Sequence, residues 1–141
     1  MSYSDAIDEI KAAIVSDCSL VYQDNPLVQN LQEDSAYDFD GVFQIKNLGG
    51  GETYREIYIN EPQIAETTIL IQVGTTIVRD RSLHEETMET RGQSVIRIVQ
   101  TPRVAFANVI LCEPRTPPRN DTQDGSNKLV WECEFRLLYR V

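Results

Sequence analysis

The stretch Leu129-Val130-Trp131-Glu132-Cys133-Glu134-Phe135-Arg136-Leu137-Leu138-Tyr139 alternates between apolar and mainly polar residues over its whole length. Successive side chains of a β-strand point to opposite faces, so a period of two predicts a strand with one face in a hydrophobic core. The odd-numbered residues from Leu129 to Tyr139 form the expected core face. The even-numbered residues from Val130 to Arg140 form the other face.

A shorter alternating run precedes this strand and predicts its partner. Val104, Phe106 and Ile110 alternate with Ala105, Ala107 and Val109. Paired antiparallel, the two strands would form a hairpin whose connection, Glu113 to Asn127, is rich in Pro, Asn, Asp and Gly. A connection of about fifteen residues is usually functional or disordered.

Strand patterns also occupy the middle of the chain. The runs 42–46 and 54–59 flank the segment Asn47–Thr53, and its three consecutive glycines predict a hairpin with a glycine-rich tip. The run 67–73 is rich in β-branched residues and predicts a central strand. Gly74 could bend or end that strand, and residues 75–78 could extend it.

Two segments carry helix patterns. Ser4 is a good N-cap, and Ile7, Ile10 and Ile14 recur at helical spacing, which predicts a helix over about 4–16. Ser82-Leu83-His84-Glu85 has the spacing of a capping box and predicts a second helix over about 82–99, before Pro102. In the alternative, Arg91-Gly92 ends this helix and residues 95–99 form a strand.

The expected order of elements is therefore helix, three strands, helix and two strands, after a long acidic connection over 17–40. This order predicts an α+β fold, with a mainly antiparallel sheet and with the N-terminal and second helices packed on one face. The length of 141 residues fits a single domain, 1–141. The sequence shows neither a membrane-spanning apolar run nor a secretory signal, so we expect a soluble protein made in the cytoplasm.

The negative charge is concentrated at the front of the chain. Residues 1–40 hold nine acids and one base, whereas residues 103–141 hold five acids and six bases. An acidic surface repels phosphate, so sequence-specific binding of nucleic acid is not expected. Acids that simply keep a small domain soluble would give the same composition.

The residue types that carry catalysis or bind metals are few and scattered. His84 is the only histidine, and Cys18, Cys112 and Cys133 have no metal-ligand spacing. Cys112 and Cys133 lie in strand patterns, where a cysteine usually acts as a small core hydrophobe, although a disulfide between those strands is geometrically possible. We therefore expect no metal site and no Cys–His nucleophile pair.

Two short motifs resemble binding loops only in part. Asp38-Phe39-Asp40-Gly41 resembles the start of a calcium loop but lacks the later ligands, which favours a turn. Gly49-Gly50-Gly51 has neither the Gly-Lys-Ser/Thr nor the helix of a phosphate loop. The sequence thus predicts a protein that is not an enzyme and needs no cofactor, with a small enzyme as the least favoured reading.

Function is instead expected on a surface that binds other proteins, formed by the excursions 47–53 and 113–127. Prolines stiffen the first half of the second excursion and reduce the entropy lost when it docks. A tolerated surface insertion is the alternative. The candidate interface residues are Leu48, Gly49, Gly50, Gly51, Arg115, Arg119, Asp121 and Asp124.

The order and size of these elements resemble those of the tail terminator proteins of long-tailed bacteriophages. The likeness rests on Ile7, Ile10 and Ile14, on the Asn47–Thr53 tip and on the final strand from Lys128 to Arg140. It implies a homo-oligomeric ring, hexameric in that family, at the top of the tail tube in the virion. Such a ring would end tail assembly and join the tail to the head through tail-tube and neck (connector) proteins. DNA could pass through an acidic lumen without binding.

A second hypothesis comes from another class of proteins. An immunity-type protein that neutralises a basic partner would also carry acids at its front, because they steer the partner into contact. Such a protein is expected to be a monomer.

Overall fold

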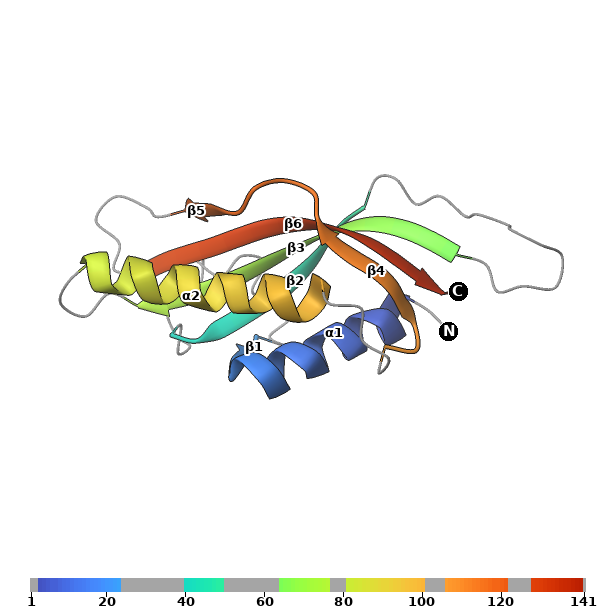
Figure 1. Ribbon diagram of the computed structural model, residues 1–141, viewed down its shortest axis with the longest axis horizontal. Coiled ribbons are helices and arrows are strands. Elements are labelled where there is room, and N and C mark those ends of the chain that lie inside the picture. The colour runs from blue at the N-terminus through green and yellow to red at the C-terminus, as the bar shows by residue number, and fades with distance from the viewer. Residues whose placement is uncertain are drawn as a thin grey trace, which may run out of the picture.

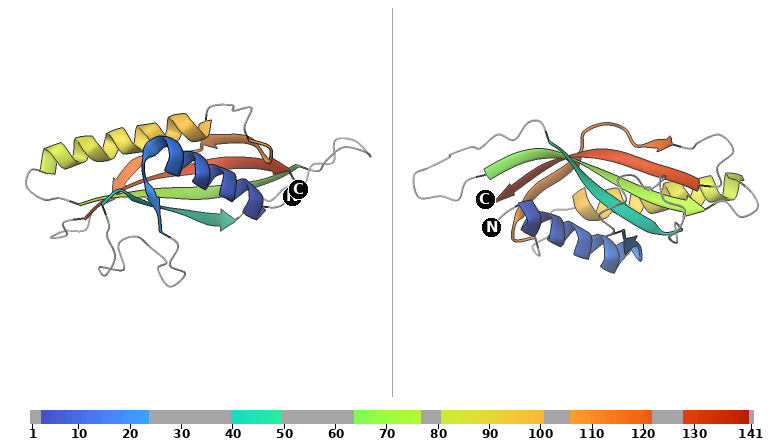
Figure 2. Two further views of the ribbon diagram at one scale, coloured as in Figure 1. Left: turned by 90° about the horizontal axis from the view of Figure 1, so that it is seen from below. Right: turned by 180° about the vertical axis from the view of Figure 1, so that it is seen from behind.

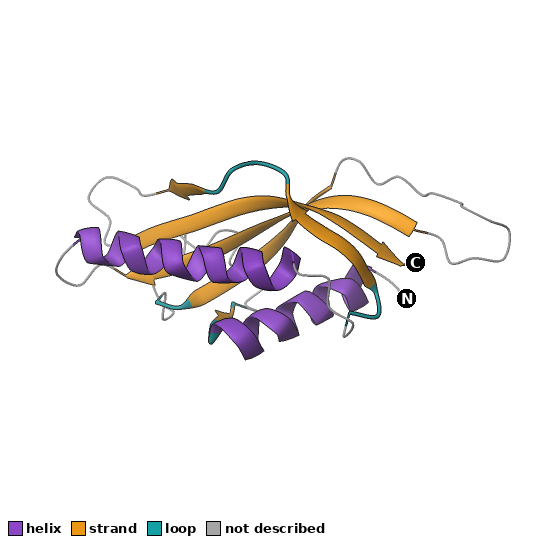
Figure 3. Ribbon diagram, in the orientation of Figure 1, coloured by secondary structure: helices purple, strands orange, loops and turns teal. Residues whose placement is uncertain are grey.

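The computed structural model describes residues 3–23, 40–49, 64–76, 81–100, 106–121 and 128–140, arranged as two helices and a twisted sheet (Figures 1 and 3). The elements are, in chain order, α1 (Tyr3–Cys18), β1 (Val21–Tyr22), β2 (Val42–Gly49), β3 (Ile64–Thr76), α2 (Arg81–Gln100), β4 (Val109–Pro114), β5 (Arg119–Asp121) and β6 (Lys128–Arg140). This order confirms the α+β class. Neither described helix is both long and apolar enough to cross a membrane.

The sheet has the strand order β1-β2-β3-β6-β4, with β5 also paired to β6. All pairs are antiparallel except β1 with β2. β3 and β6 pair along their full length, from Ile64 opposite Arg140 to Thr76 opposite Lys128. The other edge of β6 is shared, because β4 pairs with residues 135–139 and β5 with residues 130–132.

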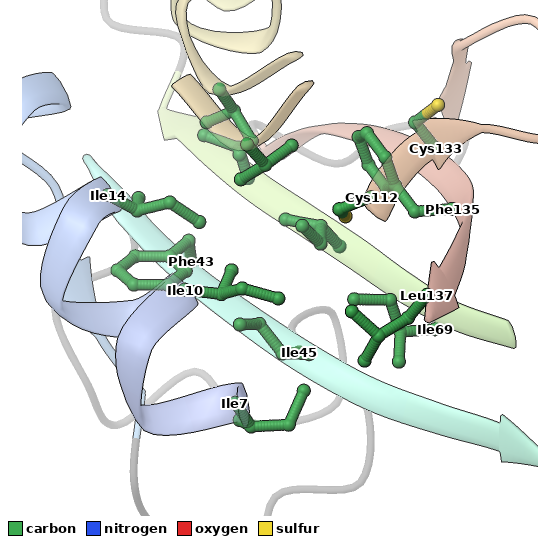
Figure 4. Packing of buried hydrophobic residues seen from close by; sticks show 14 of the residues in the cluster. Ile7, Ile10, Ile14, Phe43, Ile45, Ile69, Cys112, Cys133, Phe135 and Leu137 are labelled. Carbon is green, nitrogen blue, oxygen red and sulfur yellow. The ribbon is translucent and has the colours of Figure 1, made fainter. Parts of the chain in front are cut away.

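Both helices cover the same face of this sheet (Figure 2). Three isoleucines of α1 point towards β2, where they meet Phe43 and Ile45 (Figure 4). Met88, Val95 and Val99 of α2 belong to the same hydrophobic cluster. The core therefore lies in one layer between the helices and the sheet, as the sequence predicted.

The alternation of β6 is confirmed. All six odd-numbered residues from Leu129 to Tyr139 are buried, and Trp131 and Phe135 are fully inaccessible. Val130 and Glu132, on the opposite face, are also buried. β5 lies beside them, with Asp121 opposite Val130 and Arg119 opposite Glu132.

The second helix runs unbroken from Arg81 to Gln100, so the alternative that ends it at Gly92 and begins a strand at residue 95 is wrong. Gly92 is buried, and a Cβ built on it would lie 2.2 Å from Cε2 of Trp131. The glycine is therefore explained by the close approach of an indole ring to the helix. Its low helix propensity weakens the helix locally without ending it.

Both helices begin and end one or two residues beyond their predicted limits. α1 begins at Tyr3, so Ser4 lies inside the helix rather than capping it, and Ser19 with φ 55° follows its last residue. A residue in the left-handed region commonly ends a helix in this way. α2 begins at Arg81, one residue before the expected cap.

The glycine-rich tip is placed differently from the prediction. Asn47, Leu48 and Gly49 belong to β2 instead of a turn, and the antiparallel partner of β2 is β3. β2 continues past Asn47 because the pairing with β3 shifts register between Asn47 and Gly49, where φ is +66°. After this shift Gly49 lies opposite Thr68. The predicted strand 54–59 lies outside the described residues.

The strand before the last connection starts later than predicted. β4 begins only at Val109, because the backbone N–H groups of residues 107–109 donate hydrogen bonds to the Glu9 carboxylate. The connection 113–127 is not one loop either. Glu113 and Pro114 end β4, and β5 adds a short strand to the edge of β6. Residues 104, 105 and 122–127 lie outside the described residues.

Candidate interaction surface

The face of the sheet opposite the helices, called the outer face below, is mainly polar. It carries the even-numbered residues of β2, β3 and β6, which alternate with the core residues. Their polar members are Gln44, Lys46, Glu66, Thr68, Gln72, Glu132, Glu134, Arg136 and Arg140.

One row of this face centres on Glu132, a carboxylate with only 10% of its side chain exposed. Gln72 Nε2 donates a hydrogen bond to Glu132 Oε2 at 3.0 Å, and Arg119 Nε donates one to Oε1 at 2.7 Å. A buried carboxylate needs such partners, since leaving it unpaired would cost several kcal/mol. Arg119 therefore has a structural role in addition to its predicted place on the surface.

A second cluster centres on Arg136, which lies between Glu66 and Glu113. Its Nε donates to Glu66 Oε1, and its Nη1 lies 3.3 Å from Glu113 Oε1. These hydrogen bonds, the one to Glu66 first, raise the pKa of the guanidinium above its already high ordinary value. Arg136 thus stays charged and joins β3, β6 and β4 across the outer face.

Arg115 brings the two predicted excursions together. Its backbone N–H donates to Glu134 O at 2.7 Å, and its Nη1 donates to Thr68 Oγ1 at 2.7 Å, so its side chain crosses β6 to reach β3. Thr68 is in turn the register partner of Gly49. The end of β2 and the start of the 113–127 connection therefore meet on the outer face at Thr68.

The other predicted interface residues do not form one cluster. Leu48 is 46% exposed near the end of β2, and Arg119 is exposed in β5 beside Asp121. Gly50, Gly51 and Asp124 lie outside the described residues. Among the described members of this set, Gly49 and Arg115 are brought together because both contact Thr68.

Two polar anchors were not anticipated from the sequence. Glu9 of α1 accepts hydrogen bonds from the backbone N–H groups of Ala107, Asn108 and Val109, the shortest at 2.6 Å. Arg91 of α2 donates from Nη1 to Asp40 Oδ1 and to Thr75 Oγ1, both at 3.0 Å. A charged residue on an amphipathic helix usually faces solvent, so neither residue stood out.

The structure gives the cysteines no shared chemistry. All three are free thiols. Burial, with smaller effects from Cys133 and Glu113, raises the pKa of Cys112 to about 12. Burial, followed by Glu134, raises the pKa of Cys133 to about 11. Thiolates are therefore scarce at these two positions at neutral pH.

Among the described residues no group of three or more His, Cys, Asp or Glu side chains could hold a metal ion. His84 is partly exposed in the first turns of α2, and Asp40 and Gly41 form a turn, as the sequence predicted for the Asp38–Gly41 motif. Asp38 and Phe39 are outside the described residues.

An open groove of about 340 Å³ follows the exposed side of α2. Its lining comprises Glu86, Glu89, Thr90, Gln93, Ser94 and Arg97. Asn120 of β5 donates a hydrogen bond to Glu89 at 3.0 Å. The groove therefore lies beside the β5 edge and offers hydrogen-bonding groups, while the hydroxyls of Thr90 and Ser94 donate to the helix backbone.

The charge asymmetry of the sequence maps partly onto the two faces. The exposed residues Asp5, Asp8 and Asp17 lie on α1, on the helical side of the sheet. Arg115, Arg119 and Arg140 are exposed on the sheet side. The sheet side also carries Glu66, Glu113, Glu132 and Glu134, so the excess of acid is confined to the helical side.

Comparisons with known proteins find similarity in structure but not in sequence. No protein-family model matches the sequence, and a search of curated proteins finds no match. A structural search finds a chain from a structure described as "Virion of native gene transfer agent (GTA) particle", with a TM-score of 0.48 and 10% sequence identity. The match covers 99% of this chain and 96% of that chain.

Proposed function

We propose that the chain is a structural protein of a tailed-phage-like virion, where copies of it form a hexameric ring at the top of the tail tube. In this role the ring ends tail assembly and joins the tail to the head through the tail-tube and neck proteins. The protein is not an enzyme and uses no cofactor.

The observation that supports this proposal is the order of elements over the described chain. A short N-terminal helix, a group of strands, a long second helix and a closing group of strands is the order on which the resemblance to tail terminators rests. The thirteen-residue pairing of β3 with β6 supplies a stiff central unit, since every residue of one strand is opposite a residue of the other. A rigid subunit suits a closed ring, whose contacts must repeat with one fixed angle.

The exposed acids of α1 have a role in this proposal. If α1 lines the lumen, Asp5 and Asp8 would repel the DNA phosphates, so that DNA slides through the ring instead of binding to it. The same acids favour the second candidate, an immunity-type protein, because an exposed acidic helix would also attract a basic partner.

Native mass distinguishes the two functions. Sedimentation of the purified protein at low ionic strength, over a wide range of concentrations, should show a species of six copies, and negative-stain microscopy should show rings. A chain that stays monomeric up to its solubility limit contradicts the ring. A monomer that binds a basic protein tightly would instead support the immunity-type function.

A further inference from the structure

The groove along α2 follows one exposed stripe of that helix. Its lining residues are separated by steps of three and four positions, and residues so spaced are neighbours on the surface of a helix. The stripe runs from Glu86 to Arg97, a distance of roughly 16 Å along the helix axis. Pockets that hold ligands measure roughly 300–1,000 Å³. At about 340 Å³ the groove has room for a few side chains of a partner, and a whole helix would not fit.

The groove is rich in hydrogen-bond acceptors. Thr90 Oγ1 donates to Glu86 O at 2.9 Å and Ser94 Oγ donates to Thr90 O at 2.9 Å, so both hydroxyls have used their proton and can only accept. Glu89 Oε1 accepts a hydrogen bond from Asn120 Nδ2 at 3.0 Å, which holds this carboxylate in place and leaves Oε2 for another donor. A partner group that carries only donors is therefore the complement of these side chains.

The half of the groove that contains Glu86 and Glu89 is negatively charged. Both residues are exposed, and the carboxylate of Glu86 makes no ion pair or hydrogen bond in the part of the chain that the structure describes. Arg97 is the one base among the described lining residues. It lies just over two turns beyond Glu89 and already has an interaction of its own in the chain. The charge of the two glutamates is therefore not compensated within the groove.

We propose that this half of the groove binds an extended segment of a partner protein, with a lysine or arginine side chain between Glu86 and Glu89. An ammonium or guanidinium group has donors only, and its aliphatic stem can pack against the stems of the glutamates and of Gln93. A helix bound in a groove needs apolar anchors, and the described lining residues include none, which favours an extended segment. The inference goes beyond the proposed function and does not depend on the ring, because the groove lies within one copy.

Leu83 extends the same stripe and adds an apolar contact. It is 60% exposed and lies three positions before Glu86. The midpoint between Glu86 and Glu89 lies roughly 7 Å beyond Leu83 along the helix axis. Side chains on the same face of an extended chain are also roughly 7 Å apart. The bound segment should therefore carry an apolar residue two positions from its basic residue.

The experiment uses the full chain and a defined peptide. The probe is acetyl-Ser-Leu-Ser-Arg-Ser-Gly-amide, and its reference is the same peptide with glutamate in place of arginine. Amide chemical shifts of the isotope-labelled protein are followed by NMR at low ionic strength. The arginine peptide should shift the amides of residues 83–97 and of Asn120, whereas the glutamate peptide should leave them unchanged. Added salt should weaken the binding, since exposed charges are screened.

Two double variants with the same change of net charge locate the site. Glu86→Gln with Glu89→Gln should weaken binding of the arginine peptide about five- to tenfold, because each exposed charge pair contributes modestly. Asp8→Asn with Asp17→Asn, on the exposed side of α1, is the matched control and should bind like the wild type. Circular dichroism checks folding. Should the groove variant not fold, Glu86→Gln alone replaces it and should weaken binding about two- to threefold.

Arg97 and Leu83 provide two further variants. Arg97→Gln removes a like charge from the groove and should strengthen binding of the arginine peptide about twofold, whereas damage to the helix would weaken it. Leu83→Ser should weaken binding of the probe. It should have no effect on a peptide in which serine replaces the leucine, because the two apolar residues act on each other. The opposite sign at Arg97, or an equal effect of Leu83→Ser on both peptides, would contradict the assigned contacts.

Three results would overturn the proposal as a whole. Failure of the wild type to bind the arginine peptide is the first. The second is a spread of shifts over the acids of α1, or an equal loss of affinity in both double variants, as expected if the net charge of −9 alone attracts the peptide. The third is a shift of the groove amides when the protein is concentrated without peptide, which would make a second copy the occupant. None of these results bears on the ring, which native mass tests.

Discussion

Gly92 of α2 lies directly against the indole of Trp131 in β6. A Cβ built on Gly92 would lie 2.2 Å from Cε2, 2.3 Å from Nε1 and 2.5 Å from Cδ2 of that ring. Among the described residues, Trp131 is the largest fully buried side chain, and its Nε1 has no hydrogen-bond partner there, because the helix backbone covers it. The helix can approach the sheet this closely only because residue 92 has no side chain.

Gly92→Ala should therefore destabilise the protein, although alanine favours helix by about 1 kcal/mol over glycine. The added methyl must displace the indole or the helix, and overpacking of this kind typically costs about 1–3 kcal/mol. Urea denaturation measures the free energy of unfolding. Gln93→Ala, at an exposed neighbouring position, is the control and should change it little. A stable Gly92→Ala protein would show that the ring and helix are not in contact.

Large losses of stability are expected from substitutions at the centre of the core. Trp131→Ala or Phe135→Ala should lower the free energy of unfolding by about 3–5 kcal/mol, because each removes a fully buried aromatic ring and leaves a cavity. Trp131 is the only tryptophan, so its fluorescence reports on this site alone. Efficient quenching of native Trp131 by acrylamide would contradict the burial.

The Glu9 carboxylate should stabilise the joint between α1 and β4. Glu9→Ala leaves three backbone N–H groups without their acceptor, and we expect a loss of about 1–3 kcal/mol. Asp8→Ala, on the exposed side of the same helix, is the matched control. Hydrogen exchange should quicken at Ala107 to Val109 in the Glu9 variant only. Equal effects of both substitutions would argue against the joint.

Arg119 and Glu132 should be energetically coupled. Arg119→Ala leaves the buried Glu132 carboxylate with Gln72 as its remaining side-chain partner and should cost about 1–3 kcal/mol. In a double-mutant cycle with Glu132→Gln, the arginine should matter much less. Additive effects of the two substitutions would show that the pair contributes little.

Stability should fall at alkaline pH because of the buried thiols. Burial raises the pKa of Cys112 from 9.0 to about 12, so above pH 9 the unfolded chain loses a proton that the folded chain retains. The contribution is complete below pH 9 and is lost as the pH rises towards 12. Cys112→Ala should flatten the dependence of unfolding free energy on pH in this window. An unchanged slope would place the thiol in contact with solvent.

The strand Lys128–Arg140 and the helix Arg81–Gln100 show how far local sequence determines this fold. A period of two and a period near 3.6 place apolar residues on one face, and burial of that face is the main favourable term in folding. The core residues of β6 and the existence of both helices followed from this physics. The continuation of α2 through Gly92 did not follow from it, since only the position of Trp131 explains a glycine inside this helix.

Strand partners and polar contacts were decided by the tertiary structure. The run 42–46 has the same pattern whether it pairs with 54–59 or with β3, because alternation fixes the faces of a strand but not its neighbour. In the sequence, Glu9 and Asp8 are both acids on a helix with nothing to distinguish them. Only the fold places the backbone N–H of Asn108 against the Glu9 carboxylate. Arg115 reaches Thr68 across forty-seven positions of sequence. Side-chain identity and periodicity thus determined which surfaces are buried, and the packing of distant segments decided which charges are neutralised.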